Sequence, residues 1–135
     1  MSTNEDKKIY EEIIHKFNEC QEKDFKHTRG YKKVYKMAND LLNSSSNLSD
    51  KEKIELYIIK GNINDDIREN LDAAIREYKK ALKIDSENWS IWYNLGVSYG
   101  RKGEADLAIS IYKKVIKLNP NFAPAFYNRG VQQMV

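Results

Sequence analysis

The feature that most constrains the fold of this chain is an internal repeat with a period of 34 residues. When the sequence is shifted against itself by this period, identical or similar residues coincide: Trp92 with Phe126, Tyr93 with Tyr127, Asn94 with Asn128, Gly96 with Gly130, Val97 with Val131, Ala74 with Ala108, Ile75 with Ile109, and Tyr78 with Tyr112. Repeats of this length are units that cannot bury their apolar faces alone and are stabilised by stacking. The period therefore predicts a chain of stacked helical units.

Within one period the sequence predicts two helices. Residues 89–101 and 104–118 are each long enough for about four turns, and Gly103 separates them. Gly96 has no side chain, so another helix can approach closely at that point. Pro120 cannot continue a helix and turns the chain into the next unit. The helical spacing of the large apolar groups indicates packing rather than a cofactor site.

The spacing of these residues resembles that of the tetratricopeptide repeat (TPR) family. The matching pattern is Trp92-x2-Leu95-Gly96-x2-Tyr99, followed by Ala108-x3-Tyr112 and by Pro120. The resemblance implies an all-α fold, an α-solenoid of antiparallel helix pairs in a right-handed superhelix, with about seven helices. It also implies repeats over 49–88 and 89–122, and the first helix of an incomplete repeat, or a capping helix, over 123–135.

The repeat over 49–88 departs from the pattern in two places. It has one additional residue between Gly61 and Ala74, and Ser86 stands where proline is expected. Ser49 and Glu52 have the spacing of a capping box, which predicts a helix start at Ser49.

The N-terminal segment 1–48 is less regular. Its apolar residues predict an amphipathic helix over about 5–26 and a second helix after Gly30. The stretch Tyr35-x2-Ala38 is similar to Tyr78-x2-Ala81, so the pair is either a degenerate repeat or an unrelated cap. A serine-rich loop, 43–47, follows it.

The family resemblance implies a non-catalytic protein-interaction module. In this family the first helices of successive repeats line a concave groove that accepts a peptide or helix of a partner protein. By position, the groove residues would be Ile58 and Asn62 in one repeat, Tyr93, Asn94, Val97 and Arg101 in the next, and Tyr127, Asn128 and Val131 in the incomplete one. Tyrosine offers a large amphipathic contact, and asparagine can pair with a peptide backbone.

One subclass of this family holds the C-terminal carboxylate of a heat-shock protein between lysines, asparagines and an arginine. Asn62 and Asn94 match the asparagine positions, but Ile58 and Pro124 occupy the lysine positions and Asn128 the arginine position. A carboxylate would be desolvated there without a cationic partner, which is costly. The sequence therefore argues against this ligand.

The alternative function is self-association. The chain stops within the expected helix 123–135, which would leave Phe126, Met134 and Val135 partly uncovered. Because terminal repeats need a polar outer face, such an end can stack on another copy and give a homo-oligomer.

Other classes of function find little support in the sequence. Acids and bases are nearly balanced, with a net charge of +3. A basic cluster can face an acidic partner, a phosphate backbone or only solvent; it comprises Lys23, Lys26, His27, Arg29, Lys32, Lys33 and Lys36. Lysine predominates over arginine across the chain, which does not favour nucleic acid as a partner.

The sequence predicts neither a metal, a cofactor nor an enzyme. His15, Cys20 and His27 match no zinc spacing, and Cys20 is expected to be a small packed residue. Asn62-x-Asn64-x-Asp66 lacks the glycine and the glutamate of a calcium loop. No signal peptide or membrane span is expected, so the predicted location is cytoplasmic.

Overall fold

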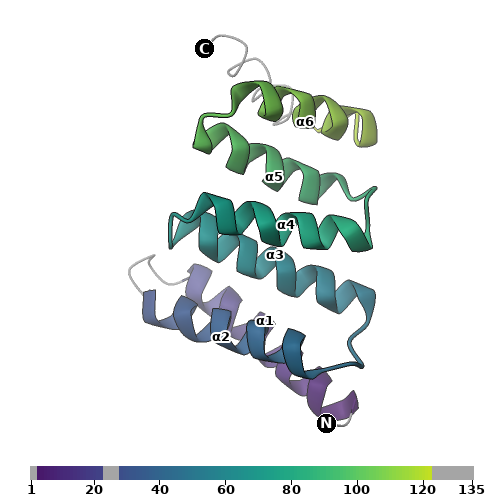
Figure 1. Ribbon diagram of the computed structural model, residues 1–135. Coiled ribbons are helices and arrows are strands. Elements are labelled where there is room, and N and C mark those ends of the chain that lie inside the picture. Colours follow the sequence, from purple (N-terminus) through teal and green to yellow (C-terminus); the bar gives the residue numbers. More distant parts are fainter. Residues whose placement is uncertain (1–2, 23–27, 123–135) are drawn as a thin grey trace.

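The computed structural model describes residues 3–22 and 28–122. These residues form six α-helices (Figure 1): α1 Thr3–Glu22, α2 Thr28–Ser44, α3 Asp50–Asp66, α4 Leu71–Ile84, α5 Trp89–Lys102 and α6 Ala105–Leu118. The predicted all-α class is confirmed. The expected seventh helix, over 123–135, lies outside the described residues, as do Phe126, Met134 and Val135.

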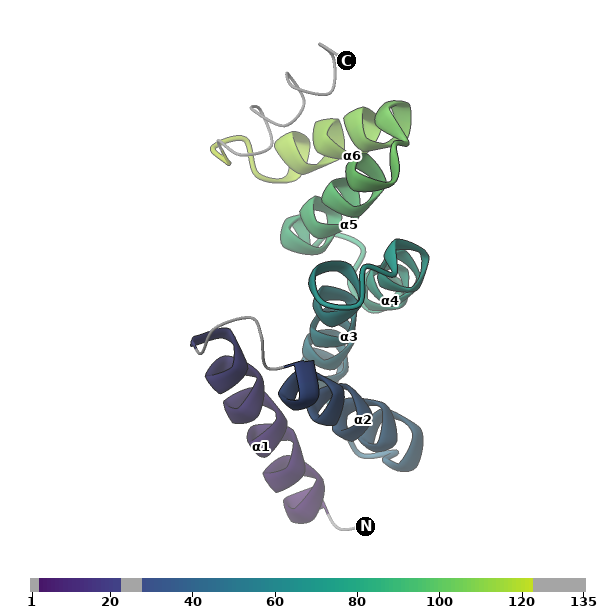
Figure 2. The same cartoon turned by 90° about the vertical axis from the view of Figure 1, so that its left-hand side faces the viewer.

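The helices stack in chain order, as in a solenoid. Each helix packs mainly against the helices that precede and follow it in the sequence. Figure 1 shows the layers following one another from α1 and α2 to α6, and Figure 2 shows α1 and α4 on opposite sides of α3. This arrangement confirms the predicted stack of helix pairs. It also gives the molecule two different faces, one formed by the first helices of the pairs (α1, α3 and α5) and one on the side of α2 and α4.

The helix ends follow the signals in the sequence. The hydroxyl of Ser49 accepts a hydrogen bond from the Glu52 N–H (3.1 Å), and the Glu52 carboxylate accepts one from the Ser49 N–H (2.9 Å). The predicted capping box is therefore present at the start of α3. Gly103 ends α5 with φ 91°, a left-handed conformation that glycine adopts without steric cost.

We expect Ser49→Ala to lower the free energy of unfolding by about 1 kcal/mol, because the Glu52 N–H loses its acceptor, the serine hydroxyl, while the backbone N–H of residue 49 can still donate to Glu52. Urea unfolding followed by circular dichroism measures the loss. The matched control is Ser46→Ala in the exposed loop before α3, which we expect to leave stability unchanged. Equal losses in the two variants would contradict a specific role for the cap.

The additional residue between Gly61 and Ala74 lies in the connection from α3 to α4. This connection spans residues 67–70, whereas α5 and α6 are joined by Gly103 and Glu104 alone. Glu69 in the longer turn has φ 52°, which is uncommon for a residue with a side chain. The Asn70 N–H donates to the Asn64 carbonyl (2.8 Å) and closes the turn. The additional residue therefore lengthens a turn and leaves the helices α3 and α4 uninterrupted.

The two C-terminal helix pairs have the same packing device. A Cβ atom built on Gly61 would lie 2.4 Å from the ring of Tyr78, and one built on Gly96 would lie 2.7 Å from the ring of Tyr112. Both tyrosines are buried. Each pair therefore brings a glycine of its first helix against a tyrosine of its second, as the sequence predicts for Gly96.

The pair α1–α2 is packed differently. Here the glycine is on the second helix: a Cβ atom on Gly30 would lie 2.7 Å from Cys20 Sγ of α1. Ala38 and Ala81 are both fully buried, but Tyr35 is only half-buried whereas Tyr78 is 2% exposed. The sequence similarity between these two stretches therefore does not extend to the packing of their tyrosines, and the pair stays either a degenerate repeat or a cap.

Candidate functional site

The predicted groove residues in the described part of the chain lie on the first helices α3 and α5. We call this set the first-helix face; it comprises Ile58 and Asn62 on α3, and Tyr93, Asn94, Val97 and Arg101 on α5. Arg101 is exposed and the other five are half-buried. The remaining predicted residues, Tyr127, Asn128 and Val131, lie outside the described residues. The face therefore combines partly accessible apolar, amide and cationic groups.

A hollow of about 440 Å³ adjoins this face at Ile58. Ile54, Ile58 and Ile84 supply its apolar wall. The polar lining consists of Asp50, Lys51, Glu55, Asp85 and Asn88. An apolar wall with a charged and amide rim can receive an apolar side chain of a partner and leave the polar groups at the edge of the contact.

Tyr93 has a packing role as well as a partly accessible surface. Its ring centroid lies 6.2 Å from that of Tyr112 and 4.9 Å from that of Phe122, the latter in an edge-to-face arrangement. Trp89 contacts the same phenylalanine, with the ring centroids 4.5 Å apart. Removing the Tyr93 ring would therefore disturb the packing of α5 on α6 as well as the surface.

Asn62 is engaged within the fold. Its side-chain oxygen accepts a hydrogen bond from the Tyr78 hydroxyl at 2.6 Å. Burial of Tyr78, with a smaller contribution from the negative charge of Asp66, raises the pKa of that phenol. The phenol therefore stays protonated and keeps donating to Asn62 to a higher pH than an exposed tyrosine would.

Arg101 forms a bridge from α5 to α3. Its guanidinium pairs with the buried carboxylate of Asp65, lies 3.5 Å from the carboxylate of Asp66, and donates to the Asp65 carbonyl at 3.2 Å. The Ser98 hydroxyl donates to the same Asp65 carboxylate. A hydrogen-bonded carboxylate shared between two helices fixes their relative position.

A second bridge joins α1 to α3 near the other end of α3. The Tyr10 hydroxyl donates to the Glu55 carboxylate. Burial, together with this hydrogen bond and the negative charge of Glu55, raises the pKa of the Tyr10 phenol. The three first helices are thus linked by polar contacts at both ends of α3, so their common face is held in one arrangement.

Sequence reasoning missed a buried polar cluster on the opposite side of α3. The Lys60 ammonium lies 3.2 Å from the Glu77 carboxylate of α4 and donates to the Asn39 amide oxygen of α2 at 2.9 Å. The side chains of Lys60 and Glu77 are only 5% and 8% exposed. Single charged residues in amphipathic helices are ordinary, and no sequence signal marks these two as buried partners.

Of the residues that the sequence offered as weak candidates for a metal site, those in the described part of the chain lie in helices, and several of them pair with other side chains. The calcium-like stretch forms the last turn of α3, in which Asn62 and Asp65 already have partners on other helices. His15 pairs with Glu19 one turn later, at 2.7 Å. In the described ranges no cluster of three or more His, Cys, Asp or Glu side chains could hold a metal ion. A helix with the length and apolarity to cross a membrane is likewise absent from these ranges.

Comparison with known families and structures agrees with this architecture. The sequence matches a TPR repeat model over residues 67–103 and a tetratricopeptide repeat model over residues 89–122. Together the matches extend from the start of the α3–α4 turn to the end of the described chain. No curated protein sequence matches the chain.

Several solved structures have the same fold. The first TPR domain of Spaghetti (RPAP3), bound to an HSP90 peptide, has a TM-score of 0.77 at 10% identity, covering 99% of this chain and 94% of that one. The Yersinia enterocolitica type III secretion chaperone SycD, in complex with a peptide of the translocator YopD, has a TM-score of 0.77 at 13% identity, covering 98% and 95%. MamA has a TM-score of 0.58 at 25% identity, covering 99% and 84%.

The repeat in the sequence and the stacked helix pairs of the fold have the same physical basis. Trp92, Gly96 and Ala108, which carry the signature spacing, all lie in the repeat over 89–122, and the tetratricopeptide repeat model matches the same residues. The glycine–tyrosine contacts explain physically why that spacing is needed. Residues 67–122 therefore match the tetratricopeptide repeat family, and the described residues have the fold of tetratricopeptide repeat structures.

Proposed function

We propose that this protein is a non-catalytic interaction module that binds a peptide or helix of a partner protein along the first-helix face. The observation that carries the proposal is the apolar hollow at Ile58, which lies beside a face that polar bridges hold in place at both ends of α3. A preformed face avoids part of the entropy cost of association. The peptide complexes of the Spaghetti and SycD domains support the same use of this fold.

The chemistry of the face favours a partner with one apolar anchor and an accessible backbone. Ile58 and the neighbouring isoleucines would receive the anchor, and Val97 would extend the apolar contact along α5. The Asn94 amide would pair with a peptide N–H or carbonyl. Asn62 and Arg101 already have partners within the fold, so their main contribution is to hold the face in position.

The test compares four immobilised baits in a pull-down from the source cell's lysate: wild type, Ile58→Glu, Val97→Glu and Leu107→Glu. Leu107 on α6 is 47% exposed and serves as the matched control outside the face. We expect a protein retained by wild type and by Leu107→Glu to bind at least about tenfold more weakly to the two face variants, because each new carboxylate would be desolvated in an apolar contact. Titration calorimetry with the purified partner measures the affinity.

Circular dichroism confirms that each bait is folded. Tyr93→Ala is not used, since it would also remove contacts with Tyr112 and Phe122. Equal retention of the same partners by all four baits would exclude the first-helix face. If the baits retain only further copies of themselves, and sedimentation shows mass rising with concentration, self-association replaces partner binding as the function.

A further inference from the structure

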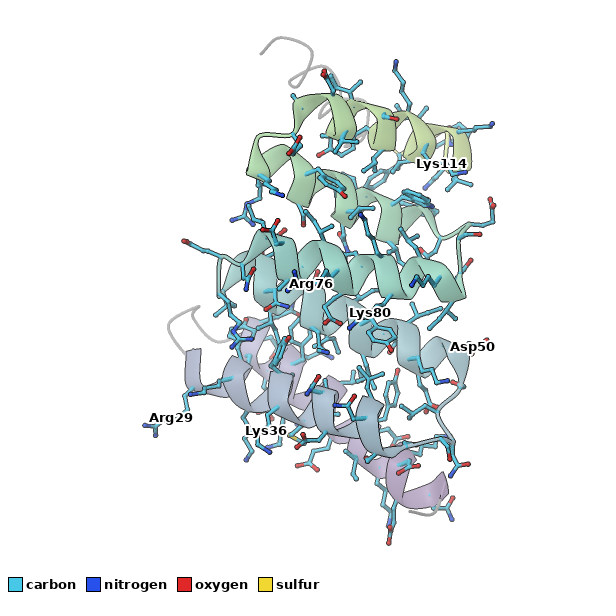
Figure 3. All side chains as sticks on the ribbon, viewed as in Figure 1. Arg29, Lys36, Asp50, Arg76, Lys80 and Lys114 are labelled. Carbon is cyan, nitrogen blue, oxygen red and sulfur yellow. The ribbon has the colours of Figure 1, made fainter. Side chains whose placement is uncertain are left out.

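A second surface feature, unrelated to the first-helix face, is a basic pocket on α2. It has a volume of about 540 Å³ and is lined by Arg29, Lys32, Lys33, Tyr35, Lys36, Asn39 and Arg68. The first six residues are on α2, and Arg68 comes from the turn between α3 and α4. Figure 3 shows Arg29 projecting from the N-terminal end of α2 and Lys36 farther along the same helix. The pocket shares no residue with the first-helix face.

The two uncharged residues of the pocket, Tyr35 and Asn39, are held in place by contacts with neighbouring side chains. The Asn39 amide oxygen accepts a hydrogen bond from the buried Lys60 ammonium at 2.9 Å. The Tyr35 ring has the Lys60 ammonium 5.3 Å from its centroid and the Arg68 guanidinium 4.7 Å from it. Cations over the face of an aromatic ring are attracted to it. Tyr35 and Asn39 are thus held in position before any ligand arrives.

Helix α2, which lines most of this pocket, has as large a net positive charge as the whole chain. Helix α2 carries four cationic side chains and one acid, Asp40, a net charge of +3. The complete chain also has a net charge of +3, so all its other residues together are balanced. Asp40 is exposed and pairs with Lys36 at 2.9 Å. Of the described residues that line the pocket, five are cationic and none is acidic.

The arrangement of these cations is unfavourable for the helix itself. Arg29 is in the first turn of α2, which contains no acid; the first turn of α5 also lacks one, whereas those of α1, α3, α4 and α6 contain acids. A cation near a helix N-terminus opposes the helix dipole. Arg29 and Lys33, and likewise Lys32 and Lys36, are four residues apart, where like charges repel. An anion bound among them would offset both effects.

We propose that the α2 pocket is a second interaction site and binds an acidic segment of a protein, with aspartate or glutamate carboxylates placed among the cations. The lysine ammonium groups and Arg68 can each donate hydrogen bonds to carboxylate oxygens. The Asn39 amide and the Tyr35 ring suit the backbone and stems of a short peptide. A nucleic acid would instead need an extended basic track, and the rest of the chain has no excess of positive charge.

The test measures fluorescence anisotropy of a labelled peptide made of Glu, Asp and Gly, and of a matched peptide in which Gln and Asn replace every acid. The pocket variant is Lys32→Gln/Lys36→Gln/Arg68→Gln. The control is Lys83→Gln/Lys113→Gln/Lys117→Gln, which removes the same charge from exposed lysines on α4 and α6. A labelled single-stranded oligonucleotide is the third probe, and circular dichroism confirms that both variants are folded.

We expect the acidic peptide to bind wild type more tightly than the amide peptide, and the affinity to weaken as salt rises. The affinity of the pocket variant for the acidic peptide should be about tenfold or more below that of wild type. The affinity of the control variant should fall by less than about twofold, since exposed charges distant from the ligand contribute little. Equal losses in both variants, or equal binding of the two peptides, would overturn the proposal. Tighter, pocket-dependent binding of the oligonucleotide would overturn it as well and assign the site to nucleic acid. The first-helix variants Ile58→Glu and Val97→Glu should bind the acidic peptide as wild type does, which separates this site from the proposed function.

Discussion

Replacing Glu77 with alanine is expected to lower the free energy of unfolding by about 3–5 kcal/mol, more than any other change considered for this protein. The reason is Lys60, whose side chain is only 5% exposed and whose ammonium has the Glu77 carboxylate 3.2 Å away. Without that carboxylate, the ammonium would be buried with a neutral amide as its nearest polar partner. An uncompensated buried charge carries most of its desolvation cost. Urea unfolding followed by circular dichroism measures the loss.

The double variant Lys60→Met/Glu77→Leu tests the physical cause. It removes both charges and keeps side chains of similar length, so we expect its stability to lie close to that of wild type or above it. Lys80→Ala is the matched control: this half-exposed lysine also pairs with Glu77, at 3.6 Å, and should cost less than about 1 kcal/mol. If Glu77→Ala has an effect as small as that of Lys80→Ala, the Lys60–Glu77 pair is not buried as described.

Gly61→Ala is expected to destabilise the protein by about 1–3 kcal/mol, although alanine is the better helix former by about 1 kcal/mol. A Cβ atom at this position would lie 2.4 Å from the Tyr78 ring, far inside van der Waals contact. The ring is 2% exposed and its hydroxyl is bound to Asn62, so it has little room to move. The helices α3 and α4 would have to separate. Thermal and urea unfolding measure the effect.

A double-mutant cycle with Tyr78→Leu isolates this contact. The leucine variant loses stability of its own, but Gly61→Ala should cost less in that background than in wild type, because the ring that the new methyl meets is gone. Gly96→Ala against Tyr112 provides a parallel case, with a corresponding distance of 2.7 Å. A purely additive cycle would contradict the close approach of α3 and α4.

The sequence by itself determined the repeat and its architecture, because both depend on local patterns. The capping box at Ser49 and Glu52, the helix end at Gly103 and the small residues at Gly61 and Gly96 act within a helix or between consecutive helices. The repeat places these contacts in register from unit to unit, and the one additional residue between Gly61 and Ala74 lies in the α3–α4 turn. A reader of the sequence can therefore predict the helices, their pairing and the family.

Only the tertiary structure decided which polar residues meet. Lys60 and Glu77 are 17 positions apart, and Asp65 and Arg101 are 36 apart, so their pairing depends on how one helix is rotated against another. Hydrophobic periodicity identifies the buried face of a helix, but not which charge lies opposite which on a neighbouring helix. For the same reason the sequence predicted Asn62 and Arg101 as groove residues but did not reveal that Asn62 contacts Tyr78 and that Arg101 pairs with Asp65. It also detected the basic cluster on α2 without Arg68, which the α3–α4 turn brings to the same pocket.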